Sequence, residues 1–366
     1  MYKILMLNKI SPVINDIFDK NYICSDNEEN PDGIILRSFN MAEYEVKDKL
    51  VAIGRAGAGV NNIPIEKMAE KGVVVFNTPG ANANAVKELV LCGMLIASRD
   101  IISGNKWVNT LTCDVAKTTE KGKGCFGGHE IFGKTLGVIG LGAIGVLVAN
   151  ASIELGLKVI GYDPYITESN KAKLNKKVEL VDLDTIYQRS NIITIHVPLL
   201  DSTKNMINAD TLEKMKDEVI IINMSRADLV NITDLKAAIA SKKVYKYVVD
   251  FPDENTINSD NIIVIPHLGA STEEAEDNCA IMAANELVDY IENGNIVNSV
   301  NYPNLSKDRN GKIRTCILFK TGCEAIDKIA GDKKIAKKGN FGYAIIDSEE
   351  AITIPDCQNI IKVRTL

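Results

Sequence analysis

Few side chains in this sequence are suited to binding metal ions. Histidine occurs only three times in 366 residues, and the eight cysteines are scattered without a C-x-x-C pair or another spacing typical of metal ligands. We therefore expect no metal site. Because paired cysteines are typical of oxidising compartments, we also expect reduced thiols in a cytoplasmic protein.

Long apolar runs and an excess of positive charge are absent as well. No run approaches the ~20 apolar residues that cross a bilayer, and the first residues, M-Y-K-I-L-M-L-N-K, are typical of a strand rather than of a signal sequence. The net charge is -6. We therefore expect neither nucleic acid nor a membrane as a partner.

The length and the charge distribution indicate more than one domain. A chain of 366 residues exceeds what one hydrophobic core usually supports. From Lys307 onward there are 12 basic and 8 acidic side chains, a balance of +4 against -10 for the remainder. We expect this tail to be a separate module, with K-K-I-A-K-K-G-N at 333–340 as a solvated loop.

Short apolar runs alternate with helical patterns along the chain, which is typical of α/β proteins with doubly wound parallel sheets. In the first part we expect strands at 3–7, 33–36, 51–53 and 73–76, and helices at 11–18, 41–47 and 65–71. Later strands are expected at 136–139, 158–161, 192–196, 219–223, 244–250 and 262–265, followed by a helix at 278–292. An apolar helix at 83–102 bridges domains, lies at a subunit interface or is an internal core helix.

A glycine-rich segment predicts the cofactor. Its glycines are Gly140, Gly142 and Gly145. They follow the apolar run 136–139 and precede a helical pattern at 143–155, which is the dinucleotide-binding order of strand, tight turn and helix. The helix N-terminus receives phosphate charge. Asp163, at the end of the next strand, is placed to accept hydrogen bonds from ribose hydroxyls, which favours NAD.

Polar residues at the ends of later strands are candidates for catalysis. His267, in P-H-L-G, is the best candidate for a base that accepts a hydroxyl proton. Arg226, in N-M-S-R, offers a planar guanidinium that matches a carboxylate. Glu254, in D-F-P-D-E-N, can hydrogen-bond the imidazole and tune its basicity, and Asp253 is the competing carboxylate. His196 is interpreted as a pocket wall.

With these residues assembled, the chain resembles the D-2-hydroxyacid dehydrogenases. The matching segments are G-R-A-G-A-G-V-N-N-I-P at 54–64, V-F-N-T-P-G-A-N-A-N at 75–84, the glycine segment, H-V-P-L-L-D-S-T-K at 196–204, N-M-S-R at 223–226 and P-H-L-G-A-S-T-E-E-A at 266–275. The resemblance spans roughly residues 1 to 303. It implies that the family's catalytic arginine, glutamate and histidine correspond to Arg226, Glu254 and His267.

The resemblance also implies cofactor and substrate contacts. Besides the three glycines, the implied cofactor contacts are Thr78, Ala143, Ile144, Asp163, Val197, Met224, Ser225, Arg226, Asp250, His267 and Gly269. The implied substrate contacts are Arg55, the backbone of Ala56, Gly57 and Ala58, and Arg37. Two arginines suit a phosphorylated 2-hydroxy acid such as 3-phosphoglycerate, although Arg37 can equally pair with a surface acid.

The fold implied by the resemblance has three parts. A Rossmann nucleotide domain at 96–269 interrupts a flavodoxin-like substrate domain built from 1–95 and 270–303, and the two close over a bound nucleotide. Residues 304–366 resemble a shortened α+β ACT regulatory domain. Phe319 and Thr321 stand where serine-binding ACT domains have histidine and asparagine, which argues against serine binding. The family also implies a homodimer or homotetramer.

Two other functions remain open. One is a dehydrogenase or reductase for an unphosphorylated 2-hydroxy acid, with glyoxylate, hydroxypyruvate or lactate as the substrate. The other is a binding protein that senses NADH without catalysis, because the same fold occurs in transcriptional corepressors. The presence of arginine, acid and histidine together disfavours the second.

Overall fold

The computed structural model describes residues 1–366. The chain divides into two compact units. Ala83–Thr272 forms one, the continuous unit, and Met1–Asn82 together with Glu273–Leu366 forms the other, the discontinuous unit. The first crossing point differs from the expected boundary at 95/96, because the helix that begins at Ala83 packs into the core of the continuous unit.

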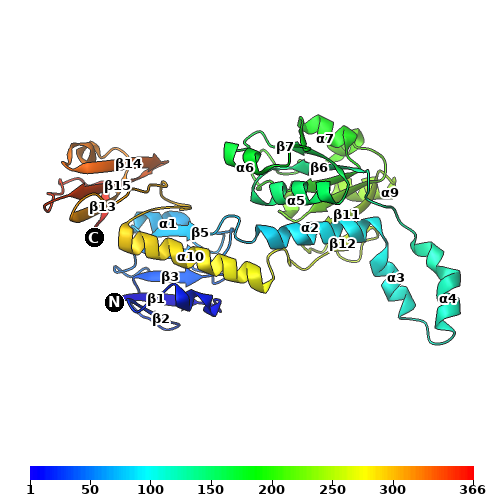
Figure 1. The fold of residues 1–366 in the computed structure, drawn as a ribbon, viewed down its shortest axis with the longest axis horizontal. Helices are drawn as coiled ribbons and strands as arrows, with labels where there is room; N and C mark the ends of the chain where they lie inside the picture. The colour runs from blue at the N-terminus through cyan, green and yellow to red at the C-terminus, as the bar shows by residue number, and fades with distance from the viewer. The chain divides into compact units, whose positions relative to one another are not determined.

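The continuous unit is built on a seven-stranded parallel sheet with the order β12-β11-β10-β9-β6-β7-β8 (Figure 1). Its strands are β6 (Thr135–Ile139), β7 (Lys158–Tyr162), β8 (Glu179–Leu180), β9 (Ile192–Ile195), β10 (Val219–Asn223), β11 (Val244–Val249) and β12 (Ile262–Val264). Its helices are α2 (Ala83–Ser98), α3 (Ile101–Val108), α4 (Val115–Gly122), α5 (Ala143–Glu154), α6 (Glu168–Lys173), α7 (Leu183–Arg189), α8 (Ala209–Lys214) and α9 (Ile232–Ala240), with short 3-10 turns at Lys123–Phe126 and Ala227–Leu229. The strand order reverses between β6 and β9, which is where a doubly wound sheet binds its ligand.

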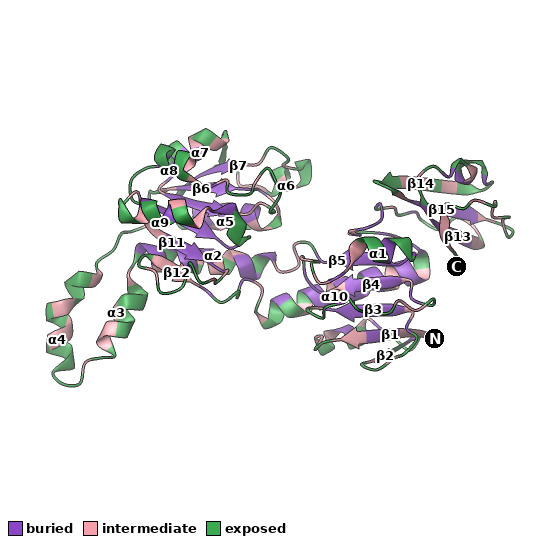
Figure 2. Cartoon of the chain, turned by 180° about the vertical axis from the view of Figure 1, so that it is seen from behind, coloured by how far each residue is buried: buried purple, intermediate pink, exposed green.

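The strands of this sheet are apolar runs because helices cover both of its faces. All residues of β9 and β10 are buried, as expected for central strands of a parallel sheet. Side chains from α2 and α5 form the core on one face. Those from α7, α8 and α9 form the core on the other. Figure 2 shows the buried residues concentrated in the strands.

Residues 101–126, called here the arm, differ from the rest of the continuous unit. The expected helix at 83–102 ends at Ser98, and α3 starts at Ile101. No residue of α3, of α4 or of the 3-10 turn that follows is buried, and the two helices extend away from the sheet (Figure 1). The rings of Trp107 and Phe126 lie 5.2 Å apart and hold the arm together.

The discontinuous unit contains a five-stranded parallel sheet with the order β2-β1-β3-β4-β5. Its elements are β1 (Tyr2–Leu7), β2 (Tyr22–Ser25), β3 (Gly33–Leu36), β4 (Ala52–Arg55), β5 (Val74–Asn77), α1 (Ile65–Glu70), α10 (Glu273–Asn293) and a 3-10 turn at Pro12–Asp16. The order reverses between β1 and β3. Two expected helices are corrected here: 11–18 contains only the 3-10 turn, and 41–47 is not helical.

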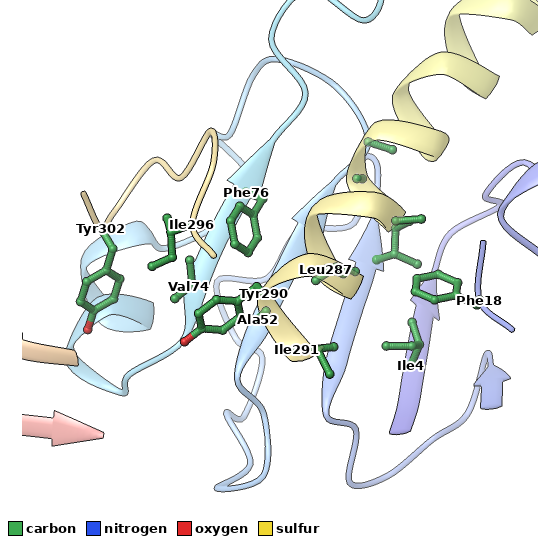
Figure 3. Close-up of a cluster of buried hydrophobic side chains, with 14 of the residues drawn as sticks. Ile4, Phe18, Ala52, Val74, Phe76, Leu287, Tyr290, Ile291, Ile296 and Tyr302 are labelled. Atoms are coloured by element: carbon green, nitrogen blue, oxygen red, sulfur yellow. The ribbon is translucent and has the colours of Figure 1, made fainter. Parts of the chain in front are cut away.

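The core of this unit joins the two ends of the chain. Leu287, Tyr290 and Ile291 of α10 pack against residues of the parallel sheet such as Ile4 and Phe76 (Figure 3). Burial of these large apolar side chains supplies the main favourable free energy for closing the unit. Residues 273 onward therefore complete a fold that begins at the first residue.

The C-terminal segment forms an antiparallel sheet with the order β14-β15-β13-β16. Its strands are β13 (Ile313–Lys320), β14 (Asp332–Lys338), β15 (Phe341–Ser348) and β16 (Ile360–Thr365), with a 3-10 turn at Glu324–Lys328. No α-helix accompanies the sheet, so an ACT-like α+β domain is not confirmed. The prediction of a loop at 333–340 is wrong, because most of this segment belongs to strand β14.

The C-terminal sheet has a small core of its own on one face and contributes to the core of the discontinuous unit on the other. Cys316 and Tyr343 belong to the same buried cluster as Ile4 and Tyr290. The Arg364 guanidinium lies 4.7 Å from the ring centroid of Tyr290 and donates to main-chain carbonyls of α10. Cys323 and Cys357 form a disulfide, whereas we expected all eight cysteines to be reduced.

None of the helices combines the length and the apolar character needed to cross a membrane.

Candidate functional site

The glycine turn lies at the switch point of the continuous unit and fits a dinucleotide. Gly140 follows β6 with φ +93°, and a Cβ there would lie 2.7 Å from the carbonyl oxygen of His196, which follows β9. A Cβ at Gly145 would lie 1.9 Å from the Gly140 oxygen, whereas a Cβ at Gly142 would meet no atom within 4 Å. Packing therefore requires glycine at positions 140 and 145, whereas Gly142 leaves space open above the turn.

Helix α5 offers its N-terminus at this open space. Gly142 is the N-cap and provides no side-chain acceptor, so the amides of Ala143 and Ile144 have no partner within the helix. Such amides and the positive end of the helix dipole suit a pyrophosphate. The residues present therefore fit the phosphates of NAD.

Asp163 lies beside the same turn. Its Oδ2 accepts from the Leu141 amide at 2.8 Å, and its Oδ1 accepts from the Tyr165 amide at 2.8 Å. A carboxylate has about four acceptor positions, so two positions remain for ribose hydroxyls. The structure therefore shows that Asp163 braces the glycine turn, and its contact with the adenosine ribose stays a prediction.

The residues after β9 and β10 lie on the same edge of the sheet. The Ser225 hydroxyl donates to the carbonyl of Ile195 at 2.8 Å, which ties the end of β10 to that of β9. Buried Asn223 accepts from the Ser225 amide and donates to the Arg226 carbonyl. This bracing leaves the Arg226 side chain exposed, with Nη1 donating to the Ser225 carbonyl at 2.6 Å.

Three of the implied cofactor residues are used in packing. Met224 is 7% exposed and belongs to the core below α2. Ile144 packs against the same core, and Val197 packs against the core on the other face of the sheet. For these residues the main chain is the part available to a cofactor.

His196 also has an unusual environment. Its Nε2 lies 2.9 Å from the Thr194 hydroxyl, and its Nδ1 is buried without a hydrogen-bond partner. Burial lowers the pKa of this histidine to about 3, because removal from water disfavours the charged imidazole. His196 is therefore neutral at ordinary pH and cannot supply the ionising base of the site.

His267 is held by a buried carboxylate. Asp250, which follows β11 and is 1% exposed, accepts from the amides of Leu268 and Gly269 at 2.8 Å each. Histidine 267 itself has φ +53°, a left-handed conformation that costs free energy outside glycine. The two hydrogen bonds that Asp250 accepts hold this turn, and the Phe251 ring lies 4.9 Å from the His267 ring.

The structure does not bring an acidic side chain to the imidazole ring of His267. Glu254 is exposed and makes no hydrogen bond or ion pair. The Asp253 carboxylate accepts from the amides of Asn255 and Thr256, so it stabilises its own loop. Hydrogen bonds to Asp253 also hold the pKa of its carboxyl below the ordinary value against the opposing effect of burial.

The predicted substrate residues gather in the discontinuous unit. Arg37 follows β3 and Arg55 ends β4, which are neighbouring strands with Leu36 opposite Arg55. The Arg55 Nε donates to the Arg37 carbonyl at 3.1 Å. Its guanidinium folds over Gly57, where a Cβ would lie 1.6 Å from Nη1 and where φ is +140°.

Further contacts support this cluster. Ala56 donates its amide to Leu36, and buried Thr78 donates its amide to Gly57. Ala58 accepts from the Asn77 side chain. Thr78, which the resemblance assigns to the cofactor, thus lies with the substrate residues. The Arg37 guanidinium forms an ion pair with Glu276 of α10.

The remaining histidine lies on the opposite edge of the seven-stranded sheet. His129 borders a cavity of about 110 Å³ together with residues at the amino ends of β9 and β10. Its ring contacts Tyr245. This position separates His129 from the glycine turn.

Comparison with known proteins assigns the family. Residues 91–269 match the model of the D-isomer specific 2-hydroxyacid dehydrogenase NAD-binding domain. The chain is 35% identical to D-3-phosphoglycerate dehydrogenase of Methanocaldococcus jannaschii over 80% of its own length and 56% of that protein. It is 37% identical to hydroxypyruvate reductase of Thermotoga maritima over 71% of its length and 83% of that protein.

A solved structure agrees with these matches. The NAD+-bound 3-phosphoglycerate dehydrogenase of Entamoeba histolytica is 25% identical, with a TM-score of 0.63 over 82% of this chain and 98% of that chain. The chain belongs to the D-2-hydroxyacid dehydrogenases, and its cofactor is NAD. It spans about half the length of the first D-3-phosphoglycerate dehydrogenases it matches.

Sequence reasoning missed several residues that shape these sites. Asp250 was assigned to the cofactor, and its role in fixing the His267 turn depends on amides 18 and 19 residues away. Glu276 and Phe251 were not singled out. The only local signal for Glu276 is its place among the acidic residues in the first turn of α10.

Proposed function

We propose that this chain is an NAD-dependent dehydrogenase that oxidises 3-phosphoglycerate to 3-phosphohydroxypyruvate. The main support is the turn that Asp250 holds, because it fixes a histidine at the same sheet edge as the glycine turn. The two arginines of the discontinuous unit support a phosphorylated substrate. The names of several relatives point in the same direction.

In the proposed reaction His267 accepts the proton of the substrate hydroxyl. The hydrogen on the carbon that carries this hydroxyl leaves as hydride. NAD, when bound, supplies the hydride acceptor. Arg226 pairs with the substrate carboxylate and orients the reacting carbon. Arg37 and Arg55 bind the phosphate. Glu254 is exposed, so its proposed part in orienting His267 requires its loop to move toward the imidazole.

A steady-state assay tests this proposal. Purified chain should reduce NAD with 3-phosphoglycerate and oxidise NADH with 3-phosphohydroxypyruvate. His267→Asn should lower kcat by at least about 100-fold, the usual range for a lost general base, and keep NADH affinity. The matched control His129→Asn, on the opposite sheet edge, should keep both. Full turnover in His267→Asn refutes the assigned role.

Reduction of hydroxypyruvate is the second candidate function. A relative that the match covers over 83% of its length carries that name, and Glu276 already pairs with Arg37. A higher kcat/KM for hydroxypyruvate than for its phosphorylated form would favour it. Binding of NADH without turnover of any 2-keto acid would favour the NADH-sensing alternative.

We also propose a homodimer or homotetramer. The arm supports this, because it exposes apolar side chains such as Ile101 and Val115 and buries none of its residues. Exposed apolar surface of this kind marks interaction sites. Sedimentation of the full chain and of Ile101→Asp tests it, since the charged variant should dissociate and a monomeric wild type would contradict it.

A further inference from the structure

The strand order of the discontinuous unit places Arg37 at a position suited to ligands. The order reverses between β1 and β3, and Arg37 directly follows β3 at the carboxyl end. In open parallel sheets ligands bind at the carboxyl ends near such a reversal. Asn8, which follows β1 with φ +76°, accepts from the amides of Ser38 and Phe39 and fixes the loop after Arg37.

Glu276 faces this position from α10. Its Oε1 lies 2.5 Å from the Arg37 Nη1, with 45% of the Glu276 side chain and 34% of the Arg37 side chain exposed. The helix around it cannot shift easily, since Ala275 and Cys279 are buried in the core. Asp277 accepts from the Ser11 hydroxyl at 2.5 Å. The carboxylate is thus presented to Arg37 by a fixed helix.

The charges of the cluster decide what it can bind. Arg37 contributes a positive charge, and Glu276 neutralises it. A phosphate ester carries a charge of about -1.5 to -2 at neutral pH, so it gains most when the Arg37 guanidinium is available. A neutral hydroxymethyl group in the same place gains nothing from Arg37. The Glu276 carboxylate repels a phosphate, and a protein can discriminate between two ligands through a group that repels one of them.

We propose that Glu276 determines substrate class by competing with a phosphate group for Arg37. The carboxylate occupies the guanidinium when no phosphate is present and must be displaced when a phosphorylated acid binds. The pair is partly exposed, and ion pairs of that kind are weak, so a phosphate can displace it at a moderate loss of affinity. Glu276 thereby weakens the preference for phosphorylated over unphosphorylated hydroxy acids. This inference rests on the proposed function of Arg37 and Arg55.

The test compares Glu276→Gln with wild type in the full chain. The variant should lower KM for 3-phosphohydroxypyruvate by about fivefold, the most that a partly exposed pair usually contributes. KM for hydroxypyruvate should change less than about twofold, with kcat preserved for both substrates. Glu274→Gln is the matched control, because Glu274 is exposed on the same helix turn and makes no ion pair; it should change neither KM.

A second variant keeps the inference separate from general charge effects. In an Arg37→Ala background, Glu276→Gln should no longer change the KM for the phosphorylated substrate. An equal effect of Glu276→Gln with and without Arg37, or an unchanged ratio of the two KM values, would overturn the inference.

Calorimetric binding of 3-phosphoglycerate gives a readout that does not need turnover. Tighter binding to Glu276→Gln than to wild type supports the inference even if the chain turns over neither substrate. A lack of turnover would refute only the proposed function. Equal binding by the two proteins rejects the role of Glu276.

Discussion

At the scale of single residues, the glycine turn separates packing requirements from cofactor requirements. Gly142 has φ -72° and no atom within 4 Å of an added Cβ, so Gly142→Ala should fold with a free energy of unfolding within about 1 kcal/mol of wild type. The new methyl group would occupy the space that a pyrophosphate needs. We expect Kd for NADH to rise by at least about tenfold, measured by fluorescence titration.

Two other glycines provide the controls for that experiment. Gly124→Ala also meets no neighbour within 4 Å and should change neither stability nor NADH affinity. Gly145→Ala brings a Cβ to 1.9 Å from the Gly140 oxygen, so it should lower stability as well as affinity. If Gly142→Ala binds NADH as wild type does, the phosphates do not approach this turn.

The residue scale also shows where sequence reasoning ends. The glycines, Asp163, Arg226 and His267 were predicted as site residues because each stands next to a strand end that the apolar pattern marks. The contacts of Asp250 and Glu276 were not predicted, because tertiary packing decides which residues they meet. A buried acid and an exposed acid at these positions look alike in the sequence, and only the hydrogen bonds to the His267 turn distinguish them.

At the scale of elements, predictions were best for the continuous unit, where β10 has the expected bounds and β6 starts one residue early. Buried parallel strands are apolar throughout, so their sequence pattern is unambiguous. The lysine-rich strand β14 was mistaken for a loop. It is an edge strand paired on one side only, and edges carry charged residues; Lys338 also donates to the Ser299 carbonyl.

The expected helix at 41–47 failed for a related reason. Its apolar and polar residues alternate as in an amphipathic helix, but Met41 is fully buried and its amide donates to the Asn62 carbonyl. The side chain of Asn62 binds the Phe39 carbonyl as well. These long-range hydrogen bonds replace the helical ones, and local propensity is weak enough for tertiary contacts to override it.

The C-terminal sheet contains a buried ion cluster whose loss should destabilise the discontinuous unit. Asp347 is 2% exposed and accepts from Arg314 and Lys307, which are also buried. These partners hold the pKa of its carboxyl well below the ordinary value despite the opposing effect of burial. Asp347→Asn should cost about 3 to 5 kcal/mol, because it leaves the buried Arg314 guanidinium without a counter-charge and leaves Lys307 only its ion pair with the exposed Asp332.

Chemical denaturation measures this loss. Glu349→Gln is the matched control: it removes the exposed pair with Lys312 at 3.2 Å, which should change the free energy of unfolding by less than about 1 kcal/mol. Equal effects of the two substitutions would show that the cluster is not a structural centre of the sheet.

Helix α10 should make stability depend on pH through Glu286. Asn298 donates to its Oε1 at 2.7 Å, while Oε2 is buried without a partner. Burial raises the pKa of this carboxyl from 4.5 to about 8, so between these values the folded chain binds more protons than the unfolded chain. The contribution of Glu286 to stability is therefore complete below about pH 4.5 and is lost as the pH rises through about 8.

Glu286→Gln should remove this dependence while keeping the hydrogen bond from Asn298. We expect the variant to equal wild type near pH 5 and to be more stable near pH 9, by on the order of 4 kcal/mol. Thermal unfolding at both pH values measures the difference, with Glu273→Gln, exposed on the same helix, as the control. A constant difference across pH would contradict the assignment.

At the scale of the whole molecule, the two units differ in how the chain builds them. The continuous unit uses one uninterrupted segment, Ala83–Thr272, whereas the discontinuous unit needs both ends of the chain. The continuous unit has its own cores on both faces of the sheet, together with the glycine turn and Asp163. The requirements for NAD binding are thus met within one contiguous stretch, as the matched family model at 91–269 also indicates.

A fragment of residues 83–272 should therefore fold cooperatively and bind NADH without the rest of the chain. Because NADH binds only the folded form, a concentration of 100 times Kd should stabilise the fragment by about 2.7 kcal/mol, measured as a shift in its thermal unfolding monitored by circular dichroism. The fragment should show no turnover, since it lacks Arg37 and Arg55. Carrying Gly142→Ala, the same fragment should fold but lose the shift. A fragment that unfolds at the same temperature with and without NADH would show that cofactor binding needs residues of the discontinuous unit, such as Thr78.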